Sequence, residues 1–334
     1  MFAIKPYPAQ ELIVPRRWTG IRKRMLGISV EEVTFKRRGF ADDGRGAMAR
    51  LEHVGRVFLH GYHAALDDDG PEVLAFNLDR IEHGFSGFAY EGAAMGLTLL
   101  DQLSLRKRNR LLTFLHGAGS KHTYMVHVGV GWAIARLPWL RRNFNRAMDH
   151  LDPLLRWLAV DGSGFSDFYF RSQSFLRNPR RLNRLQGYFA HAYAQGVGRS
   201  IWFVTGANAD RVASTISLLP DQLHADLWSG AGLACAMAGG SDSRSVERLK
   251  TAAGVFTPAL AQGAAFAAKA RQRADNPMAH TEVVCQIFCG LSAVEAAQLT
   301  DAMLKNLPAD GEIPAYEIWR QRIQSHFSRE LGQL

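Results

Sequence analysis

A short glycine phrase recurs along this chain at nearly constant spacing. It reads EGAAM, VGVGW, DGSGF, QGVGR, SGAGL and QGAAF, with a weaker first match in HGYHA. The first glycines of these seven phrases are Gly61, Gly92, Gly129, Gly162, Gly196, Gly230 and Gly263, at intervals of 31, 37, 33, 34, 34 and 33 residues. A fixed period in this range is typical of repeat architectures.

Most phrases carry a second small residue two places after the first glycine. These residues are Ala94, Gly131, Gly164, Gly198, Gly232 and Ala265. Residues two apart do not share one face of a helix, so a close contact is expected on more than one side of each segment. Glycine inside a helix costs about 1 kcal/mol relative to alanine, so tight packing has to offset that cost at every phrase.

The segments between the glycine phrases have the apolar spacing of helices, and polar turns such as TGANAD and GGSDSR separate them. No alternating strand pattern or buried Val/Ile run competes with this interpretation. We therefore predict an all-α fold of tandem helical-hairpin repeats of about 34 residues. The expected architecture resembles a tetratricopeptide α-solenoid, although that family's alanine, phenylalanine and proline offsets match only in part, and it can curl around a cavity. Residues 1–50 are expected to form a basic N-terminal arm or cap, and residues 51–334 a single helical repeat domain.

Composition narrows the class of protein further. The 334 residues are 47% hydrophobic, which excludes a disordered chain, and no apolar stretch approaches the roughly 18 residues of a membrane span. The N-terminus lacks the apolar region of a secretory signal, and three cysteines cannot all pair with one another. We expect a cytoplasmic protein. Its net charge of +9 and the basic run PRRWTGIRKR suggest docking at a membrane surface or an acidic protein, whereas no nucleic-acid module is present.

The residue directly before each first glycine is usually polar. In order, these positions hold His60, Glu91, Val128 with His127 beside it, Asp161, Gln195, Ser229 and Gln262. Equivalent positions of stacked repeats lie on one side of the array, so these side chains should form a polar row on one surface. Two interpretations stay open: a hydrogen-bonded ladder between repeats, or a catalytic group in which Glu91, His127 and Asp161 converge as acid/base groups or ligands of a non-haem metal ion.

An apolar pocket beside this row would be lined by residues at and near the phrases. The candidates for substrate binding are Trp132, Phe165, Gln195, Trp228 and Gln262. Large aromatic side chains suit a long, flat, apolar ligand. The stretch HTEVVCQIFC also offers His280, Glu282, Cys285 and Cys289, but it lacks the paired spacing of a structural zinc site, and buried apolar cysteines are the more usual outcome.

Several phrases resemble a bacterial family encoded in enediyne polyketide gene clusters. The resemblance is carried by GFAYEGAAMGL, YMVHVGVGWA, DPLLRWLAVDGSGF, DLWSGAGLACA, LAQGAAFAAKARQRA and PAYEIWRQRIQ, in this order, and covers residues 26–328. It implies action on, or assembly around, a polyene from an iterative polyketide synthase. It also implies partner proteins that include a membrane component. It supplies no catalytic residues.

Two classes of function follow. The first is an enzyme, or a subunit of one, that takes part in oxidative maturation of the polyene; a redox metal or another electron acceptor would be needed, and the cofactor is not identified by the sequence. The second is a helical scaffold or carrier that shields the polyene and assembles partner enzymes.

Overall fold

The glycine phrases lie in the middle of seven helices. The computed structural model describes residues 17–42, 44, 46–104 and 108–331, in which it contains 18 α-helices and no strand. The phrase-bearing helices are α3 (Ala47–Asp67), α5 (Ser86–Leu103), α7 (Thr123–Arg136), α10 (Trp157–Arg177), α11 (Gly187–Val204), α13 (His224–Ala238) and α15 (Thr257–Arg273). The all-α prediction is confirmed.

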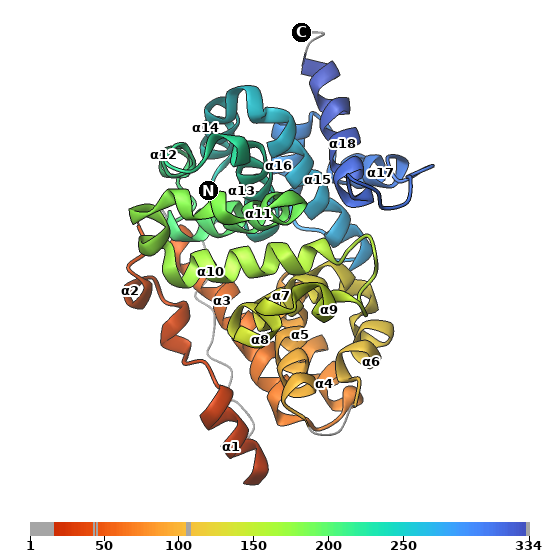
Figure 1. Cartoon of the computed structure of the whole chain (residues 1–334). Coiled ribbons are helices and arrows are strands. Elements are labelled where there is room, and N and C mark those ends of the chain that lie inside the picture. Colours follow the sequence, from red (N-terminus) through yellow and green to blue (C-terminus); the bar gives the residue numbers. More distant parts are fainter. Residues whose placement is uncertain (1–16, 43, 45, 105–107, 332–334) are drawn as a thin grey trace.

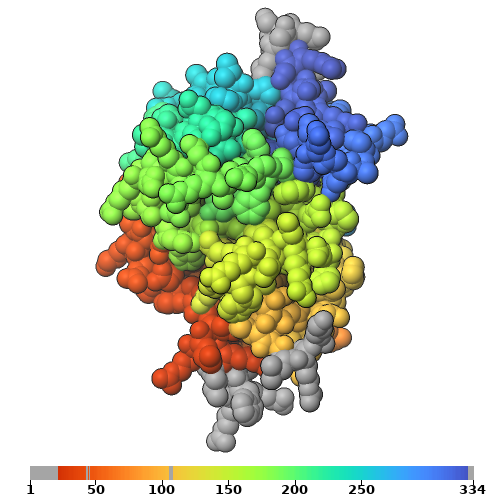
Figure 2. All heavy atoms as spheres, viewed as in Figure 1, coloured from red at the N-terminus to blue at the C-terminus, as the bar shows by residue number. Residues whose placement is uncertain are grey.

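These seven helices pack against one another in chain order, from α3 on α5 through to α13 on α15. Figure 1 shows this succession from orange through green to blue, and in Figure 2 the same colours form neighbouring bands. Regular helices whose axes approach this closely need small residues where they cross. The glycine phrases supply those residues.

The two small residues of a phrase face two different neighbours. A Cβ at Gly196 would lie closer than 3.0 Å to the carbonyl oxygen of Asp161 in the preceding helix, and one at Gly198 would meet the carbonyl of Leu227 in the following helix. The same pattern holds for Gly162 against Val128 and for Gly164 against Tyr193. The predicted close contact on more than one side of each segment is therefore confirmed.

The first phrase has a different register from the one its sequence suggests. Gly61 faces the carbonyl of Ala89 in the following helix, as the second small residue of other phrases does, and Gly92 faces the carbonyl of Phe58. Leu59 therefore occupies the first-glycine position, and the interval to Gly92 becomes 92 − 59 = 33 residues. The residue that precedes it, Phe58, takes the place in the row that the sequence assigns to His60.

The remaining elements connect and cover the central helices. They are α4 (Pro71–Asp79), η2 (His83–Phe85), α6 (Arg110–His116), η3 (Ala118–His122), α8 (Pro138–Arg142), α9 (Phe144–Met148), η4 (Pro179–Arg184), α12 (Ala209–Ser217), η5 (Asp221–Leu223), α14 (Ser243–Ala253), η6 (Gly254–Phe256), α16 (Ala279–Cys289), α17 (Ala293–Ala302) and α18 (Ala315–Leu331). Asn208 and Asp242 cap α12 and α14 at the turns expected from TGANAD and GGSDSR. Ser292 and Glu295 form a complete capping box at α17.

Polar contacts join distant parts of the chain and close the helices around an interior. The Arg271 guanidinium on α15 donates to the carbonyl oxygens of Gly84, just before α5, and of Met237 on α13. The Arg50 Nε on α3 donates to the carbonyl oxygen of Ala238 at the end of α13. These bonds bring the last phrase-bearing helices back to the first.

The N-terminal segment lies across the ends of several of these helices. It comprises α1 (Arg17–Leu26), η1 (Val30–Val33) and α2 (Phe35–Arg38). Arg38 donates to the carbonyl oxygen of Phe170 on α10, and the amide of Ala41 donates to the carbonyl of Val204 on α11. Figure 2 likewise shows the red segment beside the green one. Residues 1–16 of the predicted basic arm lie outside the described residues.

In the part of the chain that the structure describes, no single helix is both long and apolar enough to cross a membrane. Helices α16 and α17, which are bent by 63° relative to each other, meet the length and hydropathy requirement only when taken together.

Candidate functional site

Two adjoining pockets lie between the central helices. One has a volume of about 50 Å³ and the other about 30 Å³, and they share Arg199, Leu233 and Met237. Helices α3, α5, α7, α10, α11 and α13 all contribute to the larger pocket. The smaller one extends to α15 and α18. We call the pair the interior pocket.

One position of the glycine phrases supplies much of this lining. In five of the six clear phrases the residue three places after the first glycine lines the interior pocket, namely Trp132, Phe165, Arg199, Leu233 and Phe266. Met95 of the phrase EGAAM is not among the lining residues. This position and the polar one before the glycine are four residues apart, so they share one helix face. The glycine between these two positions has no side chain, so the adjacent phrase-bearing helix can pack close beside them.

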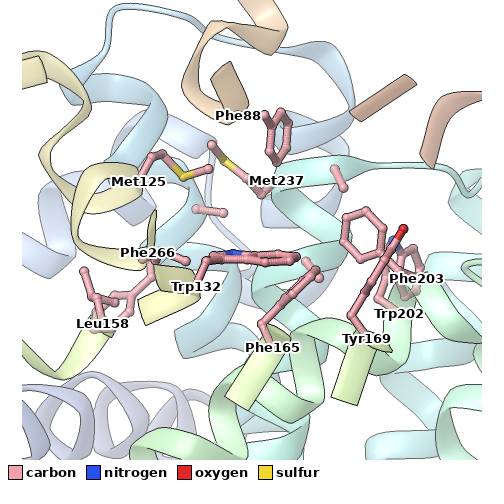
Figure 3. Packing of buried hydrophobic residues seen from close by; sticks show 14 of the residues in the cluster. Phe88, Met125, Trp132, Leu158, Phe165, Tyr169, Trp202, Phe203, Met237 and Phe266 are labelled. Carbon is pink, nitrogen blue, oxygen red and sulfur yellow. The ribbon is translucent and has the colours of Figure 1, made fainter. Parts of the chain in front are cut away.

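Aromatic rings and two methionines form a large part of the lining. The Trp132 ring lies 4.6 Å from Phe58 and 5.1 Å from Phe165, measured between ring centroids. Figure 3 shows Met125 and Met237 above Trp132, where both also lie near Gly87. Methionine side chains are unbranched and flexible, so this part of the wall can change shape without movement of the helices.

Glu91 contributes a carboxylate to the apolar pocket. Its side chain is only 3% exposed, and Oε1 accepts a hydrogen bond of 2.9 Å from the Trp132 indole nitrogen. Burial raises the pKa of Glu91 to about 7, although the Arg199 charge and the Trp132 bond act in the opposite direction. A carboxyl group with this pKa can hold or release a proton near neutral pH.

Arg199 and Asp161 form a buried ion pair beside Glu91. The Arg199 guanidinium donates to one oxygen of Asp161, and the Gln195 amide donates to the other at 2.9 Å. Arg199 is 4% exposed and also lies over the Phe165 ring, 5.2 Å from its centroid. The guanidinium is held between a carboxylate and an aromatic face, which suits a buried arginine.

The polar row continues as a chain of hydrogen bonds to the C-terminal helix. Ser229 donates to Gln262 Oε1 at 2.9 Å, and Arg320 of α18 donates to the same oxygen at 3.3 Å. Arg320 in turn forms a 2.8 Å ion pair with Asp226. From Asp161 onward, the row therefore has the geometry of the inter-helix ladder, the first of the two interpretations left open by the sequence.

The three predicted metal ligands are not brought together. Both Asp161 oxygens are bonded as described, whereas His127 Nδ1 lies 2.7 Å from the Thr123 carbonyl oxygen on its own helix. The reason is helical geometry: Val128 occupies the inward position, so its neighbour His127 points about 100° away. Among residues 17–42, 44, 46–104 and 108–331, no group of three or more His, Cys, Asp or Glu side chains is placed to hold a metal ion.

The other candidates divide into two groups. Trp132 and Phe165 line the interior pocket, whereas Gln195 and Gln262 lie in the ladder and Trp228 is buried outside the pocket lining. Cys285 and Cys289 pack on α15, and the contact with the Cys285 thiol, together with burial, raises the pKa of the Cys289 thiol.

Arg199 is a charged residue of the pocket wall that the sequence reasoning did not select as a candidate. The sequence does contain a sign of it. Among the six clear phrases, only QGVGR has a charged residue three places after the first glycine, where the other five have a bulky apolar residue.

The Glu91 carboxyl group should make stability depend on pH. Its pKa is about 7 in the folded chain against 4.5 in the unfolded chain, so between these values the folded state binds more protons and stability falls as pH rises. At about 1.4 kcal/mol per pH unit the total reaches roughly 3 kcal/mol. Glutamine does not ionise, so the free energy of unfolding of Glu91→Gln minus that of wild type should increase by this amount from pH 4.5 to pH 7.5. Urea unfolding at several pH values measures the difference. A stability difference that is constant with pH would contradict this assignment.

Fold and site together define an all-α protein whose helices enclose an apolar pocket with a buried ionisable group. The chain belongs to the family described as protein of unknown function (DUF1702), which matches residues 17–327. Neither the curated proteins nor the solved structures yield a match to the chain.

Proposed function

We propose that the protein binds an elongated, apolar polyene in the interior pocket and shields it from water. The supporting observation is that the two pockets adjoin each other at Arg199, Leu233 and Met237, and that most of their other lining residues are apolar. In this proposal the helices form a tandem array of hairpin repeats, curled so that the phrase-bearing faces enclose the ligand.

The pocket has to widen for such a ligand to enter. Volumes of about 50 and 30 Å³ hold only a few water molecules, far less than a polyene needs. Leu233 and Met237 stand at the junction, and Met125 faces the same space, so rotation of these side chains would join and enlarge the two pockets. The helix backbones, fixed by glycine contacts, keep their places.

The biosynthetic setting of the proposal comes from the sequence resemblance. A protein of an enediyne polyketide cluster would receive the polyene from an iterative synthase and act with partner proteins, one of them in the membrane. A cytoplasmic protein that docks at the membrane surface through its basic N-terminal region fits this setting. Shielding suits a conjugated polyene, which is insoluble in water and chemically reactive.

Conversion of the bound polyene is the second candidate function. It is favoured by Glu91, because a carboxyl group with a pKa of about 7 in an apolar pocket is suited to proton transfer. Binding and shielding is the better supported function, because Asp161, Gln195 and Gln262 already have hydrogen-bond partners within the protein.

A substitution at the junction tests the binding site. Leu233→Trp should fill the junction and weaken binding of the fluorescent polyene hydrocarbon diphenylhexatriene by about tenfold or more, because the indole excludes the ligand. Leu218→Trp is the matched control, since Leu218 is 59% exposed and remote from the interior pocket. Equal binding by wild type and Leu233→Trp, or no binding by wild type, would contradict the proposed function.

A further inference from the structure

Arg199 has hydrogen-bonding capacity that the protein does not use. One terminal nitrogen is bound to Asp161, whereas Nε is buried and has no hydrogen-bond partner among the described residues. The side chain lines both halves of the interior pocket. An unused donor of a buried guanidinium is unfavourable unless something in the adjoining space accepts its hydrogen.

Glu91 faces the same space from the neighbouring side. The two side chains line the larger pocket and influence each other electrostatically, but no nitrogen and oxygen atom of the pair approach within the 4.0 Å of an ion pair. Glu91 Oε1 is occupied by Trp132, and Oε2 has no hydrogen bond within the described part of the chain. Two polar groups thus flank a small region of an apolar pocket.

The charges decide what kind of ligand atom fits between them. Arg199 and Asp161 neutralise each other, and because burial raises the pKa of Glu91 to about 7, this carboxyl group is about half protonated at pH 7 and mostly protonated at pH 6 and below. A ligand carboxylate would add an uncompensated negative charge to this neutral, desolvated site, which is unfavourable. A neutral carbonyl oxygen accepts hydrogen bonds from both the Arg199 Nε–H and the protonated Glu91 carboxyl group.

We propose that Arg199 and Glu91 form a binding site for a neutral carbonyl oxygen, so that the preferred ligand is a polyene ketone, aldehyde or ester rather than a bare hydrocarbon or a carboxylate. This inference rests on the proposed function and names the substrate class of the same pocket. The apolar walls around Trp132 and Phe165 bind the hydrocarbon part, and the polar pair fixes its orientation.

A series of ligands with one conjugated tetraene tests the inference. Octadecatetraene, the methyl ester of parinaric acid and parinaric acid itself differ only in the end group, and their fluorescence reports binding. The quantity to measure is the ratio of ester affinity to hydrocarbon affinity, compared between wild type and variants so that differences in water solubility cancel. Wild type should also bind the ester more tightly than the acid.

Two variants remove the donors and one retains them. Glu91→Leu, and the double variant Arg199→Met with Asp161→Leu, should each lower the ester-to-hydrocarbon affinity ratio about tenfold. Glu91→Gln keeps an N–H donor and should preserve the ratio. The double variant removes both charges together, so that no unpaired charge is left to disturb folding.

The possible outcomes separate the two proposals. An unchanged ratio in both donor-removing variants overturns the carbonyl site and leaves polyene binding intact. Tighter binding of the acid than of the ester overturns it in favour of an anion site. Failure of wild type to bind any of the three tetraenes overturns the proposed function, and the carbonyl site with it.

Discussion

Replacing Gly196 with alanine is expected to lower the free energy of unfolding by about 3 kcal/mol, even though alanine is the better helix former. The added methyl group would lie closer than 3.0 Å to the Asp161 carbonyl oxygen and would also meet the Phe165 backbone nitrogen. Neither is the end of a flexible side chain, so two helices have to move apart. Urea unfolding followed by circular dichroism measures the change.

A second helical glycine provides the control. A Cβ at Gly87, near the start of α5, would meet side-chain atoms only, the nearest being Met125 at 3.4 Å, which is ordinary van der Waals distance. Gly87→Ala should therefore be neutral or slightly stabilising. If Gly196→Ala is as stable as Gly87→Ala, close helix packing does not require glycine in these phrases, and their spacing needs another explanation.

The regular part of the architecture could be predicted from the sequence because most of these crossings bring a helix backbone so close that only a very small residue fits there. The intervals located the helices, and the second small residue indicated two neighbours for each one. The prediction was wrong for the first phrase, where Leu59 and not Gly61 occupies the first-glycine position. This two-residue offset is visible only in the three-dimensional contacts.

The polar row could be predicted only in part from the equivalent positions of the glycine phrases. Such reasoning placed Asp161, Gln195, Ser229 and Gln262 on one face, and they do form connected hydrogen bonds there. It could not show that His127 turns aside, because a one-residue shift in a helix changes direction by about 100°. Nor could it show that Arg320, more than fifty residues after Gln262, joins the row from a different helix.

Removing the Asp161 carboxylate is expected to have the largest effect of a single substitution in the site. Asp161→Leu leaves Arg199 buried without its ion-pair partner, and loss of one member of a buried pair typically costs about 3–5 kcal/mol. Glu91 is the remaining carboxyl group that interacts with Arg199, and Asp161 contributes to its raised pKa. In the variant Glu91 should therefore ionise more readily and compensate Arg199 at pH 8, but not at pH 5, where it is protonated.

The pH dependence distinguishes a lost ion pair from a simple packing defect. Unfolding of wild type and Asp161→Leu in urea at pH 5 and pH 8 should show a larger stability loss at pH 5. The double variant with Arg199→Met, in which neither charge is present, should recover most of that loss at both pH values, because apolar side chains of similar size replace buried ion pairs without a large penalty. If the double variant is as unstable as Asp161→Leu at pH 5, the leucine itself is the cause, and Arg199 does not depend on Asp161 for its place in the pocket wall.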